Sequence, residues 1–245
     1  MTKRVLITGG AKRLGRIIAE TCAAQGWTPV IHYNASGTEA ADVAASLGGV
    51  AVGQGLEEPG AGETLIGKAV DAAGGPLHAL VNSASIFEHD TAATMTEESL
   101  LLNFRINAMA PLLLAKGFAA QAPQGSVIVN MLDQKIANPN PDHFSYTVSK
   151  EALHGVTRNL AQAFAPKIRV VGVAPGYNLP SPGQSDEKFE RLAPTVNILE
   201  KRLDPKDVAG AVLFAMTNQA ITGQVLLASN GEHLKPAARD IQLAD

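Results

Sequence analysis

Short apolar runs rich in β-branched residues alternate with segments of helical periodicity along the whole chain. Runs that are apolar on both faces are typical of parallel strands covered by helices on each side. The strands are expected at 4–8, 28–33, 50–54, 78–82, 126–131, 168–173 and 224–228. The helices are expected at 15–25, 38–47, 61–73, 96–121, 145–164 and 205–217. This alternation predicts an α/β fold, a doubly wound Rossmann-like parallel sheet of about seven strands with helices on both faces.

The length of 245 residues suits one well-buried α/β domain, and the composition asks for no second one. We therefore expect a single domain over residues 1–245. The longest irregular stretch, about 177–186, is rich in proline, glycine and serine. Loops of that length in a compact domain are often active-site lids, so we expect a substrate lid at about 177–200. A plain surface excursion is the alternative.

Charge and hydropathy argue against several classes of partner. The net charge is −3 and the basic residues are scattered, so we expect no nucleic acid. No apolar run reaches the roughly 18 residues of a membrane helix, and no leader-like segment opens the chain, which predicts a cytoplasmic protein without a membrane anchor. The single cysteine, Cys22, lies on an apolar helix face and is expected to be buried and inert. The histidines show no paired ligand spacing, so no metal is expected.

A glycine-bearing turn follows the first apolar run. Its sequence is Thr8-Gly9-Gly10-Ala11-Lys12-Arg13-Leu14-Gly15. The pyrophosphate of a dinucleotide needs backbone amides at close range and a helix N-terminus, with glycine wherever a side chain would collide. The spacing is not G-x-G-x-x-G, and tight strand-to-helix turns also use glycine for geometry alone. The turn by itself leaves both interpretations open.

The end of the second expected strand indicates the type of dinucleotide. An NAD enzyme carries an acidic residue there that binds the ribose hydroxyls. Here the segment 32–36 contains no acid, and Asn34 and Ser36 offer polar side chains instead. With Lys12 and Arg13 nearby, this turn favours a 2′-phosphate held by charge-assisted hydrogen bonds, which predicts NADPH. The alternative is that these two cations are solvated loop charges.

Tyr146 and Lys150 are four residues apart in a helical segment, and Asp133 precedes the tyrosine by thirteen positions. Residues four apart share one face of a helix, which brings the lysine ammonium near the phenol. A neighbouring cation favours the phenolate and lowers the pKa of the tyrosine. We therefore expect Tyr146 to donate the proton in a reduction. A chance Tyr-x-x-x-Lys on a helix surface is the alternative.

These motifs resemble the short-chain dehydrogenase/reductase family across nearly the whole chain. The matching pieces, in family order and spacing, are Thr8-Gly9 to Gly15, Asn82-Ser83-Ala84-Ser85, Asn107, Tyr146-x-x-x-Lys150, Pro175-Gly176 and Ile221-Thr222-Gly223. Within the family the chain is most similar to pteridine reductases, including the dihydromonapterin reductase type. Three residues that are unusual for the family support this. Arg13 stands where most members have the middle glycine, Asp133 stands where most have serine, and Phe87 follows the Asn-x-Ala-Ser turn.

The resemblance implies a role for each matching position. The implied cofactor contacts are Gly9, Arg13, Leu14, Gly15, Asn34, Ser36, Leu56, Asn82, Ala84, Ser85, Tyr146, Lys150, Pro175 and Gly176. The implied substrate contacts are Arg13, Ser85, Phe87, Asp133, Tyr146 and Tyr177. Phe87 would stack on a flat substrate opposite the nicotinamide, unless it is a core aromatic. The implied assembly is a homotetramer built through helices such as 96–121 and 145–164.

The resemblance also implies that Asn107 is catalytic and helps to hold a water or backbone link behind Lys150. One departure concerns the adenine end of the cofactor site. The usual Asp-Leu after the third strand is Gly55-Leu56, which removes a carboxylate that would contact the adenine amino group.

Asp133 indicates the class of substrate. A carbonyl reductase stabilises a developing alkoxide, which a serine hydroxyl assists and an ionised carboxylate opposes. Reduction of a C=N bond instead needs a proton on nitrogen, and a partly buried aspartate of raised pKa can deliver or relay it with Tyr146. We therefore hypothesise reduction by NADPH of a C=N bond in a pterin or dihydropterin. The alternatives are a carbonyl or 3-oxoacyl reductase of the same family and a non-catalytic NADPH-binding regulatory protein.

Overall fold

The computed structural model describes residues 2–243, in which seven parallel strands form one sheet of order β3-β2-β1-β4-β5-β6-β7. The strands are β1 (Lys3–Ile7), β2 (Trp27–Tyr33), β3 (Val50–Gly53), β4 (Ala79–Asn82), β5 (Ser126–Met131), β6 (Ile168–Pro175) and β7 (Val225–Ala228). The strand order reverses between β1 and β4, as in a doubly wound sheet. The predicted Rossmann-like fold is confirmed, and each predicted strand lies within two residues of an observed one.

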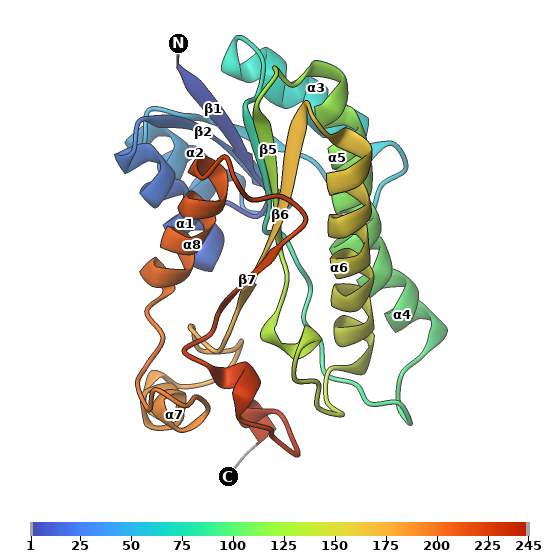
Figure 1. Cartoon of the computed structure of the whole chain (residues 1–245), viewed down its shortest axis with the longest axis vertical. Helices are drawn as coiled ribbons and strands as arrows, with labels where there is room; N and C mark the ends of the chain where they lie inside the picture. Colours follow the sequence, from blue (N-terminus) through green and yellow to red (C-terminus); the bar gives the residue numbers. More distant parts are fainter. Residues whose placement is uncertain (1, 244–245) are drawn as a thin grey trace.

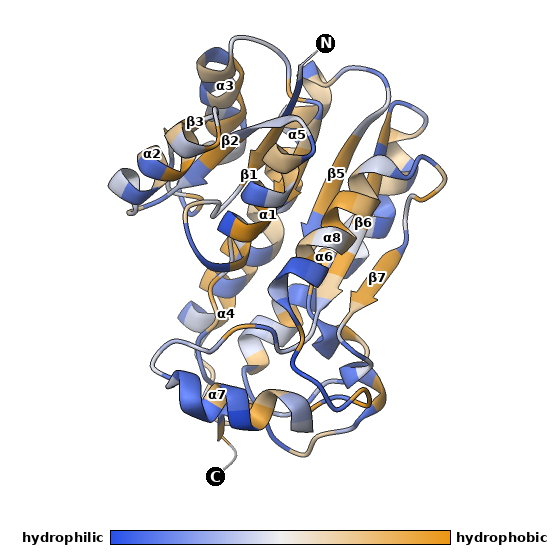
Figure 2. Ribbon diagram, turned by 90° about the vertical axis from the view of Figure 1, so that its left-hand side faces the viewer, coloured by the Kyte–Doolittle hydropathy of each residue, from blue (hydrophilic) through white to orange (hydrophobic). Residues whose placement is uncertain are grey.

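Helices cover both faces of the sheet (Figure 1). One face carries α1 (Arg13–Ala24), α2 (Gly37–Ser46) and α8 (Pro205–Thr217). The other carries α3 (Ala61–Ala73), α5 (Ala110–Gln121) and α6 (Phe144–Phe164), with α4 (Glu97–Phe104) packed against α6. In Figure 2 the strands between these layers are largely hydrophobic, while polar residues mark the outer faces of the helices. Within residues 2–243, none of the helices is both long and apolar enough to cross a membrane.

Alternate residues of a central strand supply two separate cores. Val5 belongs to the cluster that includes Ile18 of α1 and Val208 of α8. Leu6 belongs to the cluster on the opposite face, which includes Phe118 of α5. Successive side chains of a strand point to opposite faces, so a continuous apolar run buries residues against both layers. This is why the strands of this chain could be located from apolar runs alone.

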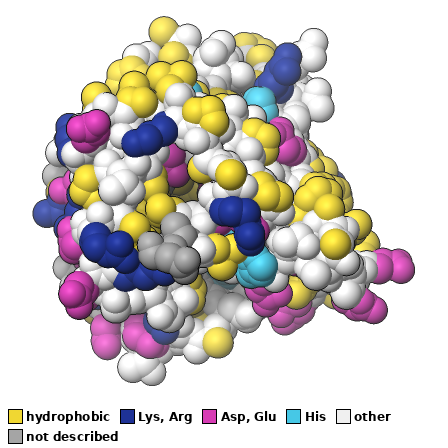
Figure 3. All heavy atoms as spheres, turned by 90° about the horizontal axis from the view of Figure 1, so that it is seen from below, with side chains coloured by type: hydrophobic (Ala, Val, Ile, Leu, Met, Phe, Trp, Pro, Cys, Tyr) yellow, Lys and Arg dark blue, Asp and Glu magenta, His cyan; other side chains and the backbone are white. Residues whose placement is uncertain are grey.

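The strands are parallel, so their carboxyl ends share one edge of the sheet, and the longest loops gather beyond that edge at the lower end of the molecule in Figure 1. These loops follow β5, β6 and β7, and the loop after β6 includes α7 (Asp186–Leu192). Figure 3 looks onto this end and shows a hollow near its centre, with basic and acidic side chains around it. Ligands of doubly wound sheets bind at this end, beside the point where the strand order reverses.

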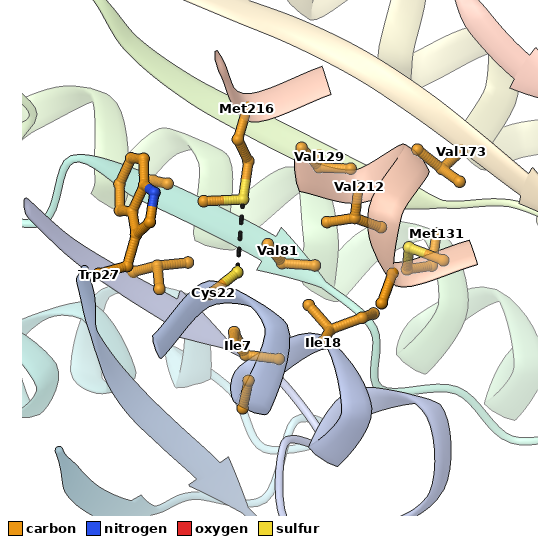
Figure 4. Packing of buried hydrophobic residues seen from close by; sticks show 14 of the residues in the cluster. Ile7, Ile18, Cys22, Trp27, Val81, Val129, Met131, Val173, Val212 and Met216 are labelled. Atoms are coloured by element: carbon orange, nitrogen blue, oxygen red, sulfur yellow. Dashed lines mark hydrogen bonds between the residues drawn. The ribbon is translucent and has the colours of Figure 1, made fainter. Parts of the chain in front are cut away.

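The predicted burial of Cys22 is confirmed. Its side chain is 1% exposed in the core between α1 and α8, and its thiol donates to Sδ of Met216 at 3.8 Å (Figure 4). Burial raises the pKa of the thiol to about 12, because the thiolate would lose its hydration. The thiol therefore stays protonated at neutral pH, which suits an inert structural cysteine.

A single helix was predicted over 96–121, but the structure interrupts it near its centre. The prediction of one continuous helix was therefore wrong. A π turn, Arg105–Met109, separates α4 from α5. The apolar pattern continues through this turn, which is why periodicity alone did not reveal it. A π turn inserts one extra residue into the helical path and is often found at functional sites. Here it carries Asn107.

Helix α7 was also missed, because the segment around it was expected to be irregular. Its N-cap is Ser185, whose hydroxyl accepts from the backbone N–H of Lys188 at 3.2 Å. Phe189 and Leu192 are buried, while the rest of the short helix is largely polar. A serine followed by two acids is a helix-start signal, and it was present in the sequence.

Candidate active site

A cavity of about 660 Å³ lies at the carboxyl ends of the strands. Its walls come from the loops after β1, β4, β5, β6 and β7, represented by Gly9, Ser85, Asp133, Gly176 and Glu232. The predicted site residues that line it are Gly9, Arg13, Leu14, Gly15, Ala84, Ser85, Phe87, Asp133, Tyr146, Lys150, Pro175, Gly176 and Tyr177. The fold thus brings most of the predicted site into one cavity.

The three residues of the predicted catalytic group meet on one wall. Asp133 follows the end of β5, and Tyr146 and Lys150 lie on consecutive turns of α6. The Tyr146 hydroxyl donates to Oδ2 of Asp133 at 2.7 Å, and Oδ1 accepts from the backbone N–H of Lys135 at 2.9 Å. The Lys150 ammonium donates to the carbonyl of Met131 at 2.8 Å. Two consecutive turns of α6 and the end of β5 therefore hold all three side chains in place.

Burial dominates the electrostatics of this group. Loss of solvent raises the pKa of Asp133, although hydrogen bonds from Lys135 and Tyr146 oppose that rise. Burial also lowers the pKa of Lys150 to about 8, with the Asp133 carboxylate acting in the opposite sense. Asp133 and Tyr146 thus share a short, buried hydrogen bond. The pKa of each group is higher than in water, so each holds its proton more firmly.

The expectation that Lys150 lowers the pKa of Tyr146 is wrong. Burial raises that pKa well above its usual value, and the negative charge of Asp133 raises it further. The Lys150 ammonium lies 5.5 Å from the centre of the tyrosine ring, and its charge does not outweigh these two effects. The structure therefore presents the tyrosine as a protonated phenol, the form that can donate.

Asn107 connects two parts of the site without lining the cavity. Its Oδ1 accepts from the backbone N–H of Ile86 at 2.9 Å and from the Ser85 hydroxyl at 3.0 Å. Its Nδ2 donates to the hydroxyl of Ser149 at 3.0 Å, beside Lys150 on α6. Among the described residues no hydrogen bond joins Asn107 to Lys150 directly. The asparagine ties the loop after β4 to the helix that carries the tyrosine and lysine.

Phe87 lies in the loop after β4 and borders the cavity. Its ring stacks on the imidazole of His143, with ring centres 3.9 Å apart and an interplanar angle of 12°. It also meets the Tyr146 ring edge-on, at 4.6 Å and 84°. The side chain is only partly buried, which argues against the alternative of a core aromatic.

The glycine turn has the donors that a pyrophosphate requires. Residues 12–15 border the cavity at the start of α1, and among the described residues no side chain caps this helix. The first amides of a helix have no partner within it, and the helix dipole favours an anion there. Gly9 has φ +66°, and a Cβ on it would come within 3.1 Å of Ala84. The glycines therefore serve the geometry of the turn as well as leaving its amides accessible.

Arg13 joins this turn to the loop after β6. Its guanidinium donates to the carbonyl of Pro180 at 2.7 Å, so it bridges the N-terminal turn and the predicted lid. Its φ is +51°, in the left-handed region that glycine adopts without cost. The resemblance places a glycine at this position in most members of the family, and the backbone retains the conformation that suits one.

Two variants separate the backbone and side-chain roles of Arg13. We expect Arg13→Gly to be more stable than Arg13→Ala by about 1 kcal/mol, because only alanine keeps the left-handed strain. Both variants lose the contact with Pro180. Urea unfolding of the two proteins measures the difference, and equal stabilities would show that the backbone is not strained there.

Four predicted cofactor residues lie outside the walls of the cavity, namely Asn34, Ser36, Leu56 and Asn82. The side chain of Leu56 is 8% exposed and packs in the core, so only its backbone is available to a ligand. Asn82 donates to Oδ1 of Asn130 at 2.8 Å. The Lys12 ammonium is paired with Glu39 at 2.9 Å, an acid of α2 that the sequence interpretation did not consider.

The sequence interpretation missed Glu232, which follows β7 and lines the cavity. Its carboxyl accepts from the backbone N–H of Tyr177 at 2.7 Å and from Nε2 of Gln134 at 3.3 Å. Burial raises its pKa to about 8, and the negative charge of Asp133 adds to that rise. Glu232 thereby holds together the loops after β5 and β6. No local motif marks such a residue, since its partners are distant in sequence.

A pair of ionic contacts anchors the C-terminal segment over the same end of the molecule. Arg239 forms a two-pronged bond to Asp142, with the Nε–Oδ2 and Nη2–Oδ1 distances both 2.8 Å. That contact holds the pKa of Asp142 well below its usual value. Lys135 pairs with Asp240 at 2.8 Å, and both side chains are buried. No local sequence pattern marks these pairings either.

Glu232→Gln should change how stability depends on pH. The folded pKa of about 8 lies above the ordinary value of 4.5, so ionisation of Glu232 destabilises the fold as pH rises through this window. The glutamine side chain keeps an oxygen that can accept a hydrogen bond, and it carries no charge at any pH. We expect the variant to match the wild type near pH 4.5 and to be more stable by about 2 kcal/mol above pH 8.

Urea unfolding from pH 4.5 to pH 9 measures this difference, with Glu187→Gln on the exposed face of α7 as the matched control. A constant difference between wild type and Glu232→Gln across that range would contradict the raised pKa.

The chain is similar to several known reductases. A family model described as enoyl-(acyl carrier protein) reductase matches residues 9–233. Pteridine reductase 1 of Leishmania tarentolae is 32% identical, over 95% of this chain and 96% of its own. The granaticin polyketide synthase putative ketoacyl reductase 2 of Streptomyces violaceoruber is also 32% identical, over 94% of this chain and 95% of its own.

A solved structure extends the likeness to three dimensions. The FolM alternative dihydrofolate reductase 1 of Brucella canis, complexed with NADP, superposes with a TM-score of 0.88. It is 34% identical and covers 99% of this chain and 98% of its own.

Proposed function

The chain belongs to the short-chain dehydrogenase/reductase family, and we propose that it uses NADPH to reduce a C=N bond of a pterin or dihydropterin. The observation that carries the proposal is the buried hydrogen bond of 2.7 Å between Tyr146 and Asp133. The pteridine reductase and alternative dihydrofolate reductase among its relatives support the same substrate class.

The proton chemistry follows from that bond. Tyr146 is a protonated phenol at neutral pH and can donate to a ring nitrogen at the cavity wall. The resulting phenolate would lie beside Asp133, whose raised pKa allows it to hold a proton and return it to the tyrosine. Lys150 places a positive charge near the phenolate and offsets part of the cost of burying it. The three residues thus supply a proton that can be replenished.

NADPH would supply the hydride when bound. The uncapped start of α1 and the glycine turn suit its pyrophosphate, and NADP occupies the structure of the Brucella relative. We propose that Asn34 and Ser36 lie near the 2′-phosphate and that Arg13 contributes to the cofactor site from the glycine turn. The family resemblance implies that Pro175 and Gly176 flank the nicotinamide, and both residues border the cavity at the end of β6.

The substrate would lie between the nicotinamide and Phe87. A partly exposed aromatic ring on the cavity wall suits a flat heterocycle, because stacked rings gain contact area without a large loss of conformational freedom. Tyr177 borders the same space from the loop after β6. We propose that the segment of about 177–200, which Arg13 contacts at Pro180, acts as the substrate lid.

A carbonyl or 3-oxoacyl reductase is the second candidate. Burial raises the pKa of Asp133, and a protonated carboxyl could donate a hydrogen bond to an alkoxide as serine does. The ketoacyl reductase relative favours this candidate too. We rank it second because Oδ2 of Asp133 accepts a hydrogen bond from the Tyr146 hydroxyl in the structure, whereas the serine-like role requires the carboxyl to donate.

Steady-state oxidation of NADPH decides between the two. The purified protein is given a dihydropterin such as dihydrobiopterin or dihydromonapterin, or an acetoacetyl thioester, with NADH as the cofactor control. We expect oxidation that depends on the dihydropterin and is much slower with NADH. Turnover of the thioester alone would replace the pterin assignment with the second candidate. Cofactor binding without any turnover would support a non-catalytic role.

The assembly is proposed to be a homotetramer. Large apolar side chains are exposed on the helices of one face, among them Leu101 and Phe104 of α4, Leu112 of α5 and Val148 of α6. A second copy of this chain would cover them, as the expected assembly through these helices requires. Light scattering of the purified protein measures the state, and a monomer at micromolar concentration would reject this assignment.

A further inference from the structure

We propose that His143 is a positioning residue that fixes the ring of Phe87 as a wall of the substrate site. This inference rests on the proposed stacking of a flat substrate against Phe87. His143 itself lies behind that ring and does not border the cavity. It would act on the substrate only through Phe87, not as an acid or base.

The two rings form a close stack. Their centres are 3.9 Å apart and their planes differ by 12°, so the imidazole covers one face of the phenyl ring. Phe87 comes from a loop and is only partly buried, so little else from its own segment restricts its rotation. A side chain already held in its binding orientation loses less conformational freedom when a ligand stacks on it.

The imidazole is itself held in place. The side chain is 3% exposed, and its Nδ1 lies 2.9 Å from the carbonyl of Glu88. A carbonyl can only accept, so Nδ1 must carry the proton of that hydrogen bond. Nε2 is buried and has no hydrogen-bond partner among the described residues. Burial lowers the pKa of His143, so the ring is neutral and stacks without a net charge.

The backbone of His143 links this support to the catalytic helix. His143 precedes the first residue of α6 and has φ +55°, a left-handed conformation that is uncommon outside glycine. Its carbonyl accepts from both the backbone N–H and the hydroxyl of Thr147, each at 2.9 Å. Tyr146 follows three residues later and meets Phe87 edge-on. Strained residues of this kind persist where the surrounding contacts hold them, and they cluster at functional sites.

His143→Asn removes the aromatic ring while changing little else. Asparagine tolerates the left-handed backbone, and its amide retains an N–H that can donate to Glu88. Phe87→Leu removes the other ring of the stack. We measure the KM of a dihydropterin, the KM of NADPH and kcat for the wild type, each single variant and the double variant.

We expect His143→Asn to raise the KM of the dihydropterin about fivefold, within the range of one aromatic pair, and to change kcat and the KM of NADPH less than twofold. In the Phe87→Leu background the same substitution should have no further effect, because the ring that it positions is gone. If His143→Asn raised the KM of the dihydropterin by the same factor in the wild type and in Phe87→Leu, the positioning role would be overturned. An equal rise in the KM of NADPH would overturn it as well.

A second measurement needs no variant at His143. In NMR spectra of the NADP⁺ complex, addition of a dihydropterin should shift the His143 ring protons in the wild type but not in Phe87→Leu. Equal shifts in both proteins, or none in either, would overturn the inference.

Failure of the pterin assignment gives a different pattern. If the wild type reduces only the acetoacetyl thioester, the proposed substrate is wrong and the same four proteins are compared with the thioester. Coupling between positions 87 and 143 would then support the positioning role on the other substrate, and independence would overturn it.

Discussion

Replacing Tyr146 by phenylalanine is expected to lower kcat for a dihydropterin by about 10³-fold, the range of a lost general acid. The substitution keeps the ring that meets Phe87 edge-on and removes only the hydroxyl that donates to Asp133. No other described hydroxyl in the cavity is held against a buried carboxyl in the same way. The proton would then have to come from water or from Asp133.

The binding of NADPH provides the control for this variant. We expect its Kd to rise no more than about tenfold, the value of one hydrogen bond. The free energy of unfolding should fall by about 1–3 kcal/mol, because the buried Asp133 oxygen loses the hydrogen bond from the hydroxyl. A Tyr146→Phe enzyme that keeps more than about a tenth of the wild-type kcat would exclude Tyr146 as the proton donor.

Substitution of Asp133 is expected to have the second-largest effect and to change the substrate preference. Asp133→Ser removes the group that can return a proton to Tyr146, so kcat for the dihydropterin should fall about 10²-fold. The serine hydroxyl can instead donate to a developing alkoxide, so reduction of an acetoacetyl thioester should increase. The ratio of kcat/KM for the two substrates measures this change.

Asp133→Asn is the matched control, because it keeps an acceptor for the tyrosine hydroxyl but cannot take up a proton. We expect it to lose pterin turnover like the serine variant without gaining activity on the thioester. Full pterin turnover by either variant would show that Asp133 has no part in the proton transfer. Comparison of the two variants therefore shows whether Asp133 acts by taking up a proton or only by accepting a hydrogen bond from Tyr146.

Local sequence patterns were sufficient for the sheet and for most helices. Strands such as β5 are apolar on both faces because layers of helices cover them, and that burial is visible in the sequence. The π turn that carries Asn107 could not be predicted, because it changes the hydrogen-bond register without changing the residue pattern. Helix α7 has a clear start at Ser185 but only two buried residues, too few to establish a helical period.

Contacts between site residues could be predicted only where the spacing of two residues along the chain determines whether they meet. Tyr146 and Lys150 share a helix face by their separation, whereas their distance to Asp133 depends on how α6 packs beside the end of β5. The direction of the tyrosine pKa was wrong because burial, not the nearby cation, controls it. The stack of His143 on Phe87 joins residues far apart in the sequence, and no local pattern marks it.

Transfer of deuterium from NADPH labelled at both C4 positions of the nicotinamide tests the central proposal most directly. The labelled cofactor is incubated with the enzyme and a dihydropterin, and the product is analysed by mass spectrometry and NMR. We expect one deuterium on the ring carbon of the former C=N bond and a solvent-derived hydrogen on the adjacent nitrogen. A product without ring deuterium, while the same labelled cofactor transfers deuterium to the C3 ketone of the acetoacetyl thioester, would contradict the pterin assignment.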